Sequence, residues 1–443
     1  MKARASKSQP PADYLDILTG AANGLDRIDL DELRARVRGE GRSLDRDAVR
    51  ERLAKIEARV AKDPASAFEF DSAGNATLVT SDRRYEAGRF ETVPIGRLRD
   101  RAAAVAERGG SGGKGSAIRL SIALGGDPLL DIGALQGWAT ERTLFQVASQ
   151  FNCLESVGPF LSPVRNYPSD PTQGPRASVS AFPGIFLRHY AAPSPDGRFE
   201  QRSERQLDLL ARAIPRSVGR VESGYLSSQT IGDKKALAPT LLKNFESIEV
   251  GVHDGIEVVF GHNWGGPVSD PAPRIAQVLT STLALGCYSD NGKSVVGACK
   301  PLLRAAYLGT ILAAFALGKR RAVLTLIGGG AFGNPLDEIW AAIRWAIGEA
   351  DGMAHGPLDV VVNARESSPP EEIREEVKRR KGTVVSVDER EKKSPKSRSD
   401  AKTSPKPRSA RAGEPDQAAA SERPGSPLNQ RSLLQIQELF HGL

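Results

Sequence analysis

Three consecutive glycines follow an apolar run late in the chain, in the stretch AVLTLIGGGAFGNP (322–335). A buried strand that ends in glycine lets the backbone approach a ligand closely. The run LDEIWAAIRWAI that follows predicts a helix, with Asn334 as its cap and Pro335 at its first position. Free backbone N–H groups at such a turn form an anion site, best suited to phosphate. A plain turn that requires positive φ explains the same residues.

Three earlier stretches place polar side chains after apolar runs or in a loop rich in Pro and Gly. They are ALGGDPLLDIGALQG (123–137), LFQVASQFNCLESVGP (144–159) and NYPSDPTQGP (166–175). Together with the glycine turn, these loops supply the carboxyl, amide and hydroxyl groups that a ligand site needs. Their candidate site residues are Asp131, Ile132, Asn152, Glu155, Asp170, Thr172 and Gln173.

The elements that must position these loops alternate between short apolar strands and helices. This alternation is typical of a layered α/β fold. Strands are predicted at 117–124, at the start of 143–152, at 321–329 and at 358–364, with two short strands around a turn at 248–261. Helices are predicted at 205–214, 274–286, 300–318 and 336–350.

Composition divides the chain into three parts. Residues 1–65 are charged and carry apolar side chains at helical spacing, which predicts a helical extension. Residues 66–388 hold the α/β pattern. Residues 389–443 are rich in Lys, Ser, Pro and Arg and cannot bury enough apolar surface to order themselves. The amphipathic end SLLQIQELFHGL is compatible with a terminal helix.

The positive charge of the chain is concentrated in this tail. The formal net charge is +7, and residues 391–411 contain eight Lys/Arg against two Asp/Glu, a net of +6. Basic runs beside Ser-Pro bind phosphate backbones without sequence preference, so nucleic-acid contact through 389–411 is one interpretation. A solvated tail is the other. The body is close to neutral.

The cysteine, histidine and apolar content of the chain limits which compartments and cofactors fit the sequence. Three cysteines without zinc-ligand spacing and five scattered histidines predict no metal site and a reducing, intracellular compartment, cytoplasmic or nuclear. No signal peptide is apparent, although secretion by a dedicated machine stays open. No apolar run approaches the roughly 20 residues that span a bilayer, so no membrane partner is expected.

The Asp-Ile-Gly after a strand, the strand that ends in an Asn-bearing loop and the late GGGAFGNP loop together resemble a macrodomain, the ADP-ribose-binding fold. The resemblance covers about residues 66–365 and implies a three-layer α/β fold, a mixed sheet flanked by helices. It implies that Asp131 contacts the adenine and Asn152 the distal ribose. It also implies that a late loop wraps the diphosphate. This loop comprises Gly328, Gly329, Gly330, Ala331, Phe332, Gly333 and Asn334.

The combination of VASQFNCLE with Y-x-x-D-x-T-Q-G-P is similar to a divergent poly(ADP-ribose) glycohydrolase-like branch, the MavL-type ADP-ribosylarginine hydrolases. This similarity implies removal of ADP-ribose from arginine side chains of a modified protein. The chain departs from the common pattern at two points. CLESVGP replaces the glycine run that normally follows the asparagine, and the paired glutamates of poly(ADP-ribose) glycohydrolases are not visible.

Cleavage at C1 of ribose passes through an oxocarbenium-like state, which needs loop carboxylates but in principle no metal or other cofactor. Asp170 and Glu155 are the favoured catalytic candidates, Asp254 is third, and Asp290 is a further candidate. Each has a structural alternative. Glu155 fits a solvent-facing acid at a helix start, Asp170 an Asx-turn, and the other two simple turn residues.

Three functions remain open from the sequence. The first is an ADP-ribosyl hydrolase, favoured because acidic residues occur in the same loops as the presumed ribose contacts. The second is a reader that binds ADP-ribose without cleaving it. The third is a nucleic-acid-associated protein that acts through the tail.

Overall fold

The computed structural model describes residues 15, 30–39, 44–109, 118–126, 128–156, 160–286, 293–353 and 356–387. The chain up to Val387 forms one compact unit. The predictions for the tail 389–443, including nucleic-acid contact at 389–411, lie outside the described residues, as does Asp290.

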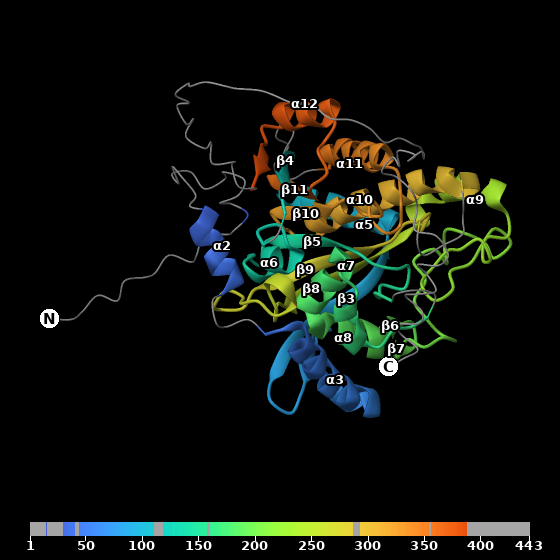
Figure 1. Cartoon of the computed structure of the whole chain (residues 1–443). Helices are drawn as coiled ribbons and strands as arrows, with labels where there is room; N and C mark the ends of the chain where they lie inside the picture. The colour runs from blue at the N-terminus through green and yellow to red at the C-terminus, as the bar shows by residue number, and fades with distance from the viewer. Residues whose placement is uncertain are drawn as a thin grey trace, which may run out of the picture. The chain divides into compact units, whose positions relative to one another are not determined.

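A mixed sheet dominates this unit, and ten of its strands lie in the described residues, in the order β1-β2-β3-β8-β9-β5-β10-β11-β4-β12 (Figure 1). Neighbours from β1 to β9 run antiparallel, and neighbours from β9 to β12 run parallel. The strands are β1 (Phe68–Phe70), β2 (Ala76–Val79), β3 (Arg84–Pro94), β4 (Ile118–Leu124), β5 (Thr143–Ala148), β8 (Glu249–Glu257), β9 (Arg274–Thr280), β10 (Arg321–Thr325), β11 (Leu358–Arg365) and β12 (Val384–Ser386). A separate hairpin pairs β6 (Ala192–Ser194) with β7 (Gly197–Phe199).

Helices cover both faces of the sheet, which confirms the predicted layered α/β fold (Figure 1). One layer holds α5 (Ile95–Gly109), α9 (Lys234–Lys243), α10 (Cys299–Ala316), α11 (Leu336–Asp351) and α12 (Glu371–Arg379). The other holds α3 (Arg46–Lys62), α6 (Ile132–Gly137), α7 (Gln173–Ser180) and α8 (Phe182–Tyr190). The short helices α2 (Leu30–Arg38) and α4 (Pro64–Ala67) flank α3 in sequence.

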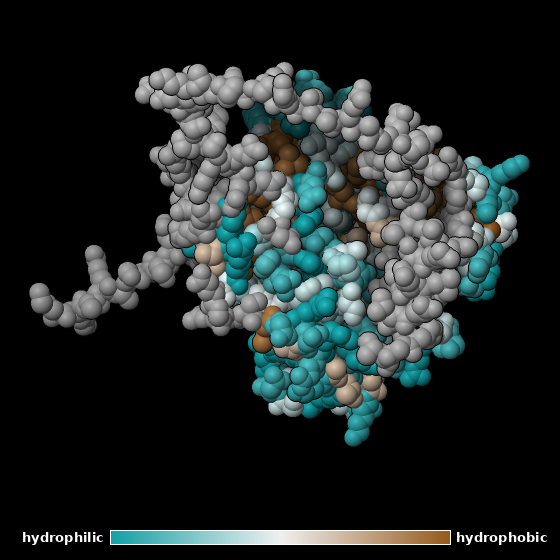
Figure 2. Space-filling model, viewed as in Figure 1, coloured by the Kyte–Doolittle hydropathy of each residue, from teal (hydrophilic) through white to brown (hydrophobic). Residues whose placement is uncertain are grey.

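The predicted N-terminal extension contributes α3 to the second layer. One face of α3 is buried through Val49, Leu53, Ile56 and Val60, because apolar residues recur at helical spacing. The helix packs on α8 and on the 3-10 turn η1 (Val164–Ser169). In Figure 2, hydrophilic residues cover the surface where α3 and α8 lie, and hydrophobic residues show in a recess above it.

The helix α10 forms the centre of the first layer, where it packs against α5, α11 and the middle of the sheet. With the turn before it, the segment Ser294–Ala316 is 23 residues long and apolar enough to cross a membrane by length and composition. This was not expected from the sequence, where Lys300 and Arg304 interrupt the apolar run. Because 78% of its 18-residue apolar window is buried inside the protein, this single helix is weak evidence for a membrane span.

Two predicted helices were wrong. Residues 274–280 form strand β9, and residues 281–286 continue as an irregular segment. The side chains of β9 are buried after its first residue because neighbouring strands and both helical layers enclose it. A strand buried on both faces lacks alternation, so its apolar run reads equally well as a helix. Residues 205–214 form turns, although Leu209, Leu210 and Ile214 are buried.

The two strands predicted within 248–261 were also wrong, because β8 is continuous there. The Asp-Gly pair makes a bulge instead of a hairpin turn: the register with β9 shifts between His253 and Ile256. Gly255 supplies the positive φ, 77°, that the bulge requires.

Candidate functional site

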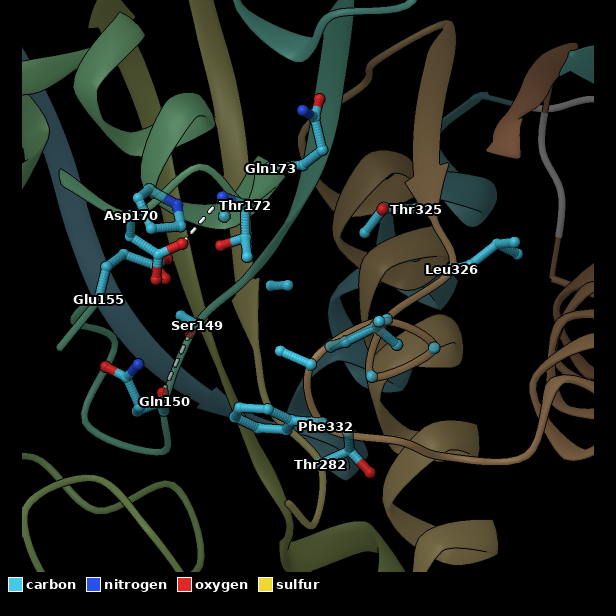
Figure 3. Close-up of a pocket in the computed structure, with 18 of the residues that line it drawn as sticks. Ser149, Gln150, Glu155, Asp170, Thr172, Gln173, Thr282, Thr325, Leu326 and Phe332 are labelled. Carbon is cyan, nitrogen blue, oxygen red and sulfur yellow. Dashed lines mark hydrogen bonds between the residues drawn. The ribbon is translucent and has the colours of Figure 1, made fainter. Parts of the chain in front are cut away.

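A cavity of about 310 Å³ lies at the carboxyl ends of parallel strands in the middle of the sheet (Figure 3). Its walls come from residues 148–150 after β5, Thr282 after β9, residues 325–332 after β10, and residues 363–367 at the end of β11. Loop 170–175 closes another side. Open α/β sheets characteristically bind ligands at this edge.

The glycine loop after β10 offers unpaired backbone donors to the cavity. Gly328 has a φ of 75°, and a Cβ there would lie 2.6 Å from the methyl group of Thr282, so only glycine fits. A Cβ at Gly330 would meet open space. Among the described residues, the N–H groups of Gly330 and Ala331 have no hydrogen-bond acceptor. Such adjacent free N–H groups form an anion site.

Asn334 closes this loop instead of capping the following helix, which corrects the sequence prediction. The helix α11 begins at Leu336 with Pro335 in the cap position, and no side chain caps it. The Asn334 side chain accepts from the Thr282 hydroxyl (2.9 Å) and donates to the Leu283 carbonyl (2.7 Å). It is 3% exposed and does not line the cavity, nor does Gly333.

Two of the predicted carboxyl groups line the opposite wall and lie next to each other (Figure 3). Asp170 follows η1, and its Oδ1 accepts a hydrogen bond from the Thr172 N–H (2.8 Å), which is the Asx-turn of the structural alternative. Glu155 is 5% exposed, and its Oε1 accepts from the Ser178 hydroxyl at 3.3 Å. The idea that Glu155 faces solvent is therefore wrong.

Burial raises the pKa of Glu155 well above its usual range. The guanidinium of Arg188 opposes this rise, and the neighbouring Asp170 adds to it. The protonated form of Glu155 is thus favoured, which makes it a proton donor inside the cavity.

The start of α7 completes the carboxyl wall. Gly174 lies directly over β5, because a Cβ there would overlap the Ala148 carbonyl oxygen and lie 2.9 Å from Oε2 of Glu155. Gln173 lines the cavity while its Oε1 accepts from the Ile132 N–H (3.0 Å).

Several implied ligand residues do not line the cavity. Asp131 is 1% exposed, accepts from the N–H groups of Gly133 (3.0 Å) and Ala134 (3.3 Å) at the start of α6, and pairs with Arg176. All of these partners belong to the protein itself, so the observed contacts of Asp131 are structural. Ile132 lies beside it, buried, and touches the site only through its bond to the Gln173 side chain.

Asn152 and Asp254 also lie away from the cavity. Asn152 is fully buried, where it accepts from the Leu154 N–H (3.1 Å) and donates to Gln206 (2.8 Å). Asp254 occupies the β8 bulge and pairs with Lys319 at 2.7 Å.

The sequence analysis missed Tyr225, Thr282 and Arg365 as lining residues. Thr282 follows the end of β9 and Arg365 is the last residue of β11, a signal that a systematic search of strand termini would have found. Tyr225 belongs to an irregular loop and carried no such signal. The ring centroids of Tyr225 and Phe332 lie 6.1 Å apart. This short distance predicts a narrow passage between the glycine loop and residues 148–156.

Two observations bear on metal and thiol chemistry near this site. In the parts of the chain that the structure describes, no three His, Cys, Asp or Glu side chains gather to hold a metal ion. Burial raises the pKa of the Cys153 thiol to about 12, so a thiolate nucleophile is not available there.

No protein-family model and no curated protein matches this chain. Solved structures similar to it include a poly(ADP-ribose) glycohydrolase from Thermomonospora curvata, with 16% identity and a TM-score of 0.33 over 75% of this chain and 99% of that one. Another is a poly(ADP-ribose) glycohydrolase from Deinococcus radiodurans in complex with ADP-ribose, with 11% identity and a TM-score of 0.34 over 64% and 89%.

Proposed function

We propose that this protein is a hydrolase that removes ADP-ribose from modified protein side chains. One observation carries the proposal: a single cavity combines free N–H groups on a glycine loop with a pair of carboxyl groups on the facing wall. A diphosphate needs the first, and cleavage of the adjoining ribose bond needs the second.

Binding is assigned to the glycine loop. The N–H groups of Gly330 and Ala331 donate to the diphosphate, and the rings of Tyr225 and Phe332 flank the passage. Fixing the diphosphate holds C1 of the distal ribose at the carboxyl wall, so positioning supplies much of the rate.

The two carboxyl groups divide the acid–base work. Glu155, whose raised pKa keeps its proton, protonates the leaving atom of the modified side chain. Asp170 stabilises the positive charge at C1 and takes the proton of the water that adds there. The products are free ADP-ribose and the unmodified side chain, and the proton count balances without a metal or other cofactor.

The modified side chain that we propose is arginine. A guanidinium is cationic, and the Asp170 side chain offers it an acceptor at the end of the cavity where it would leave. The test compares ADP-ribosyl-arginine, ADP-ribosyl-serine and ADP-ribosyl-glutamate peptides, with and without EDTA. Preference for the arginine peptide, unchanged by EDTA, is expected; cleavage of another linkage alone refutes the arginine proposal.

A glycine-loop variant tests the binding step. In the full-length chain, Gly330→Asp places a carboxylate in open space at the presumed diphosphate position, and binding of ADP-ribose should weaken at least about tenfold. Gly348→Asp is the matched control, because this exposed glycine of α11 also has open space around it. Equal binding by both variants refutes the proposed diphosphate site. Tight ADP-ribose binding without release from any peptide favours the reader.

A further inference from the structure

Glu57 is a buried acid on a helix whose other acidic side chains are exposed. It is 3% exposed in α3, in the segment that composition separated from the rest of the chain. Buried glutamates require partners. Its Oε1 accepts from the Val164 N–H (2.6 Å) and the Tyr190 hydroxyl (3.1 Å), and its Oε2 from the N–H (3.3 Å) and guanidinium (3.0 Å) of Arg165.

These bonds hold the start of η1. The residue before this turn is Pro163, whose side chain cannot cap it. A carboxylate from α3 therefore accepts from the first two N–H groups of η1, as a local cap would.

The same short turn contacts both carboxyl residues of the candidate site. Its last residue is followed directly by Asp170. In its middle, the Tyr167 hydroxyl accepts a hydrogen bond from the Glu155 N–H (3.1 Å), and the Tyr167 side chain is fully buried. A shift of η1 would therefore move Asp170 and loosen Glu155 together.

Packing alone does not fix η1 against α3. A second cavity, about 400 Å³, adjoins Glu57 and is lined by Arg165, His189 and Tyr190 as well as by alanines of α3. With open space beside the contact, hydrogen bonds to Glu57 have to supply much of the constraint.

We propose that Glu57 is a positioning residue for the two carboxyl groups, acting through η1. The inference rests on the proposed hydrolase function for its kinetic readout. It also means that the N-terminal helical segment contributes to the site, because α3 supplies the hydrogen-bond acceptor that sets the geometry of loop 170–175.

The experiment compares Glu57→Gln with Glu51→Gln in the full-length protein. Glutamine keeps the size of the side chain but offers an NH₂ group to N–H donors. Glu51 lies on the same helix and is exposed, paired only with Lys55 (2.7 Å). We expect kcat of Glu57→Gln to fall about 10- to 100-fold, the usual effect of displacing reacting groups by about 1 Å. KM and ADP-ribose affinity should stay within twofold, because the glycine loop is untouched.

Hydrogen exchange of the amides of 164–170 provides a readout that does not depend on turnover. It should accelerate in Glu57→Gln and not in Glu51→Gln. Unchanged kcat with unchanged exchange overturns the inference, as does an equal loss of kcat and ADP-ribose affinity, which indicates general destabilisation. If the wild type cleaves no substrate, the hydrolase proposal fails, and the exchange comparison alone decides the role of Glu57.

A second variant covers the case in which Glu57→Gln does not fold. Val164→Pro removes the N–H that bonds to Glu57 and keeps the carboxylate. The backbone of Pro163 (φ −56°, ψ 146°) already suits a residue before proline. The same fall in kcat and faster exchange are expected, and wild-type values for both overturn the inference.

Discussion

Replacing Glu155 by glutamine tests the proposed acid directly. Glutamine has the shape of the protonated carboxyl group, and the Ser178 hydroxyl can keep its bond to the remaining oxygen. Because Glu155 is 5% exposed, a larger change would open the core, whereas this one removes little but the transferable proton. The fold and ADP-ribose binding should therefore survive.

The loss of rate follows from the role assigned to the proton. General acid catalysis contributes about 10²- to 10⁴-fold, so kcat on an ADP-ribosylated peptide should fall by that factor. KM should change little, since the glycine loop supplies binding.

The free energy of unfolding should change with pH in a direction that follows from the raised pKa of Glu155. The pKa of Glu155 in the folded protein lies above its ordinary value of 4.5, so the folded state binds more protons between the two values. Wild-type stability is therefore fully present below pH 4.5 and falls as pH rises through the folded pKa, by at most about 1.4 kcal/mol per pH unit. Glutamine does not titrate, so the Tm of Glu155→Gln should gain on the wild type as pH rises.

Two assays check these expectations: release of free ADP-ribose at several pH values and thermal unfolding from pH 4 to 9. Wild-type turnover by Glu155→Gln would remove Glu155 from the mechanism. A Tm difference that stays constant with pH would refute the buried, protonated carboxyl group itself.

Three further substitutions test the geometry of the site. Gly174→Ala should lower the free energy of unfolding by about 1–3 kcal/mol in chemical denaturation, because its Cβ overlaps the Ala148 carbonyl; no loss would refute the close approach of α7 to β5. Asn334→Ala should cost about 1–3 kcal/mol and weaken calorimetric ADP-ribose binding, since the loop loses its tie to β9; unchanged binding would refute that tie. Asp254→Asn should leave kcat unchanged, because Asp254 pairs with Lys319 away from the cavity; a large kcat loss would return Asp254 to the site.

The elements with strong local signals were predicted well. The strands before the glycine loop and at 358–364 are short apolar runs with defined ends, and the helices on either side of β10 are too long to be strands. The helix predicted at residues 274–286 was wrong because β9 is enclosed on all sides. Nothing in its own apolar pattern therefore distinguishes a strand from a helix. That distinction is made by β8 and β5, which hydrogen-bond to it.

Which acidic residues line the cavity could also be predicted only in part from the sequence. Asp170 and Glu155 lie in loops that follow or face strand ends, and both reach the cavity. Asp131 and Asp254 sit in equally suggestive local contexts, yet each is used in a structural contact, with Arg176 and Lys319 respectively. Loop composition cannot separate these outcomes, because the partner is far away in sequence.

The sequence by itself determined the layered α/β class, the glycine turn after β10 and the set of acidic loop residues. These depend on local properties: the spacing of apolar residues, the φ that glycine permits, and the lack of apolar residues in the loops. Only the tertiary structure decided that Glu155 is buried with a raised pKa, that Asn334 closes a loop, and that Glu57 from α3 accepts hydrogen bonds from the start of η1. Burial and hydrogen-bond partners are properties of the assembled layers, and no single stretch of the chain contains them.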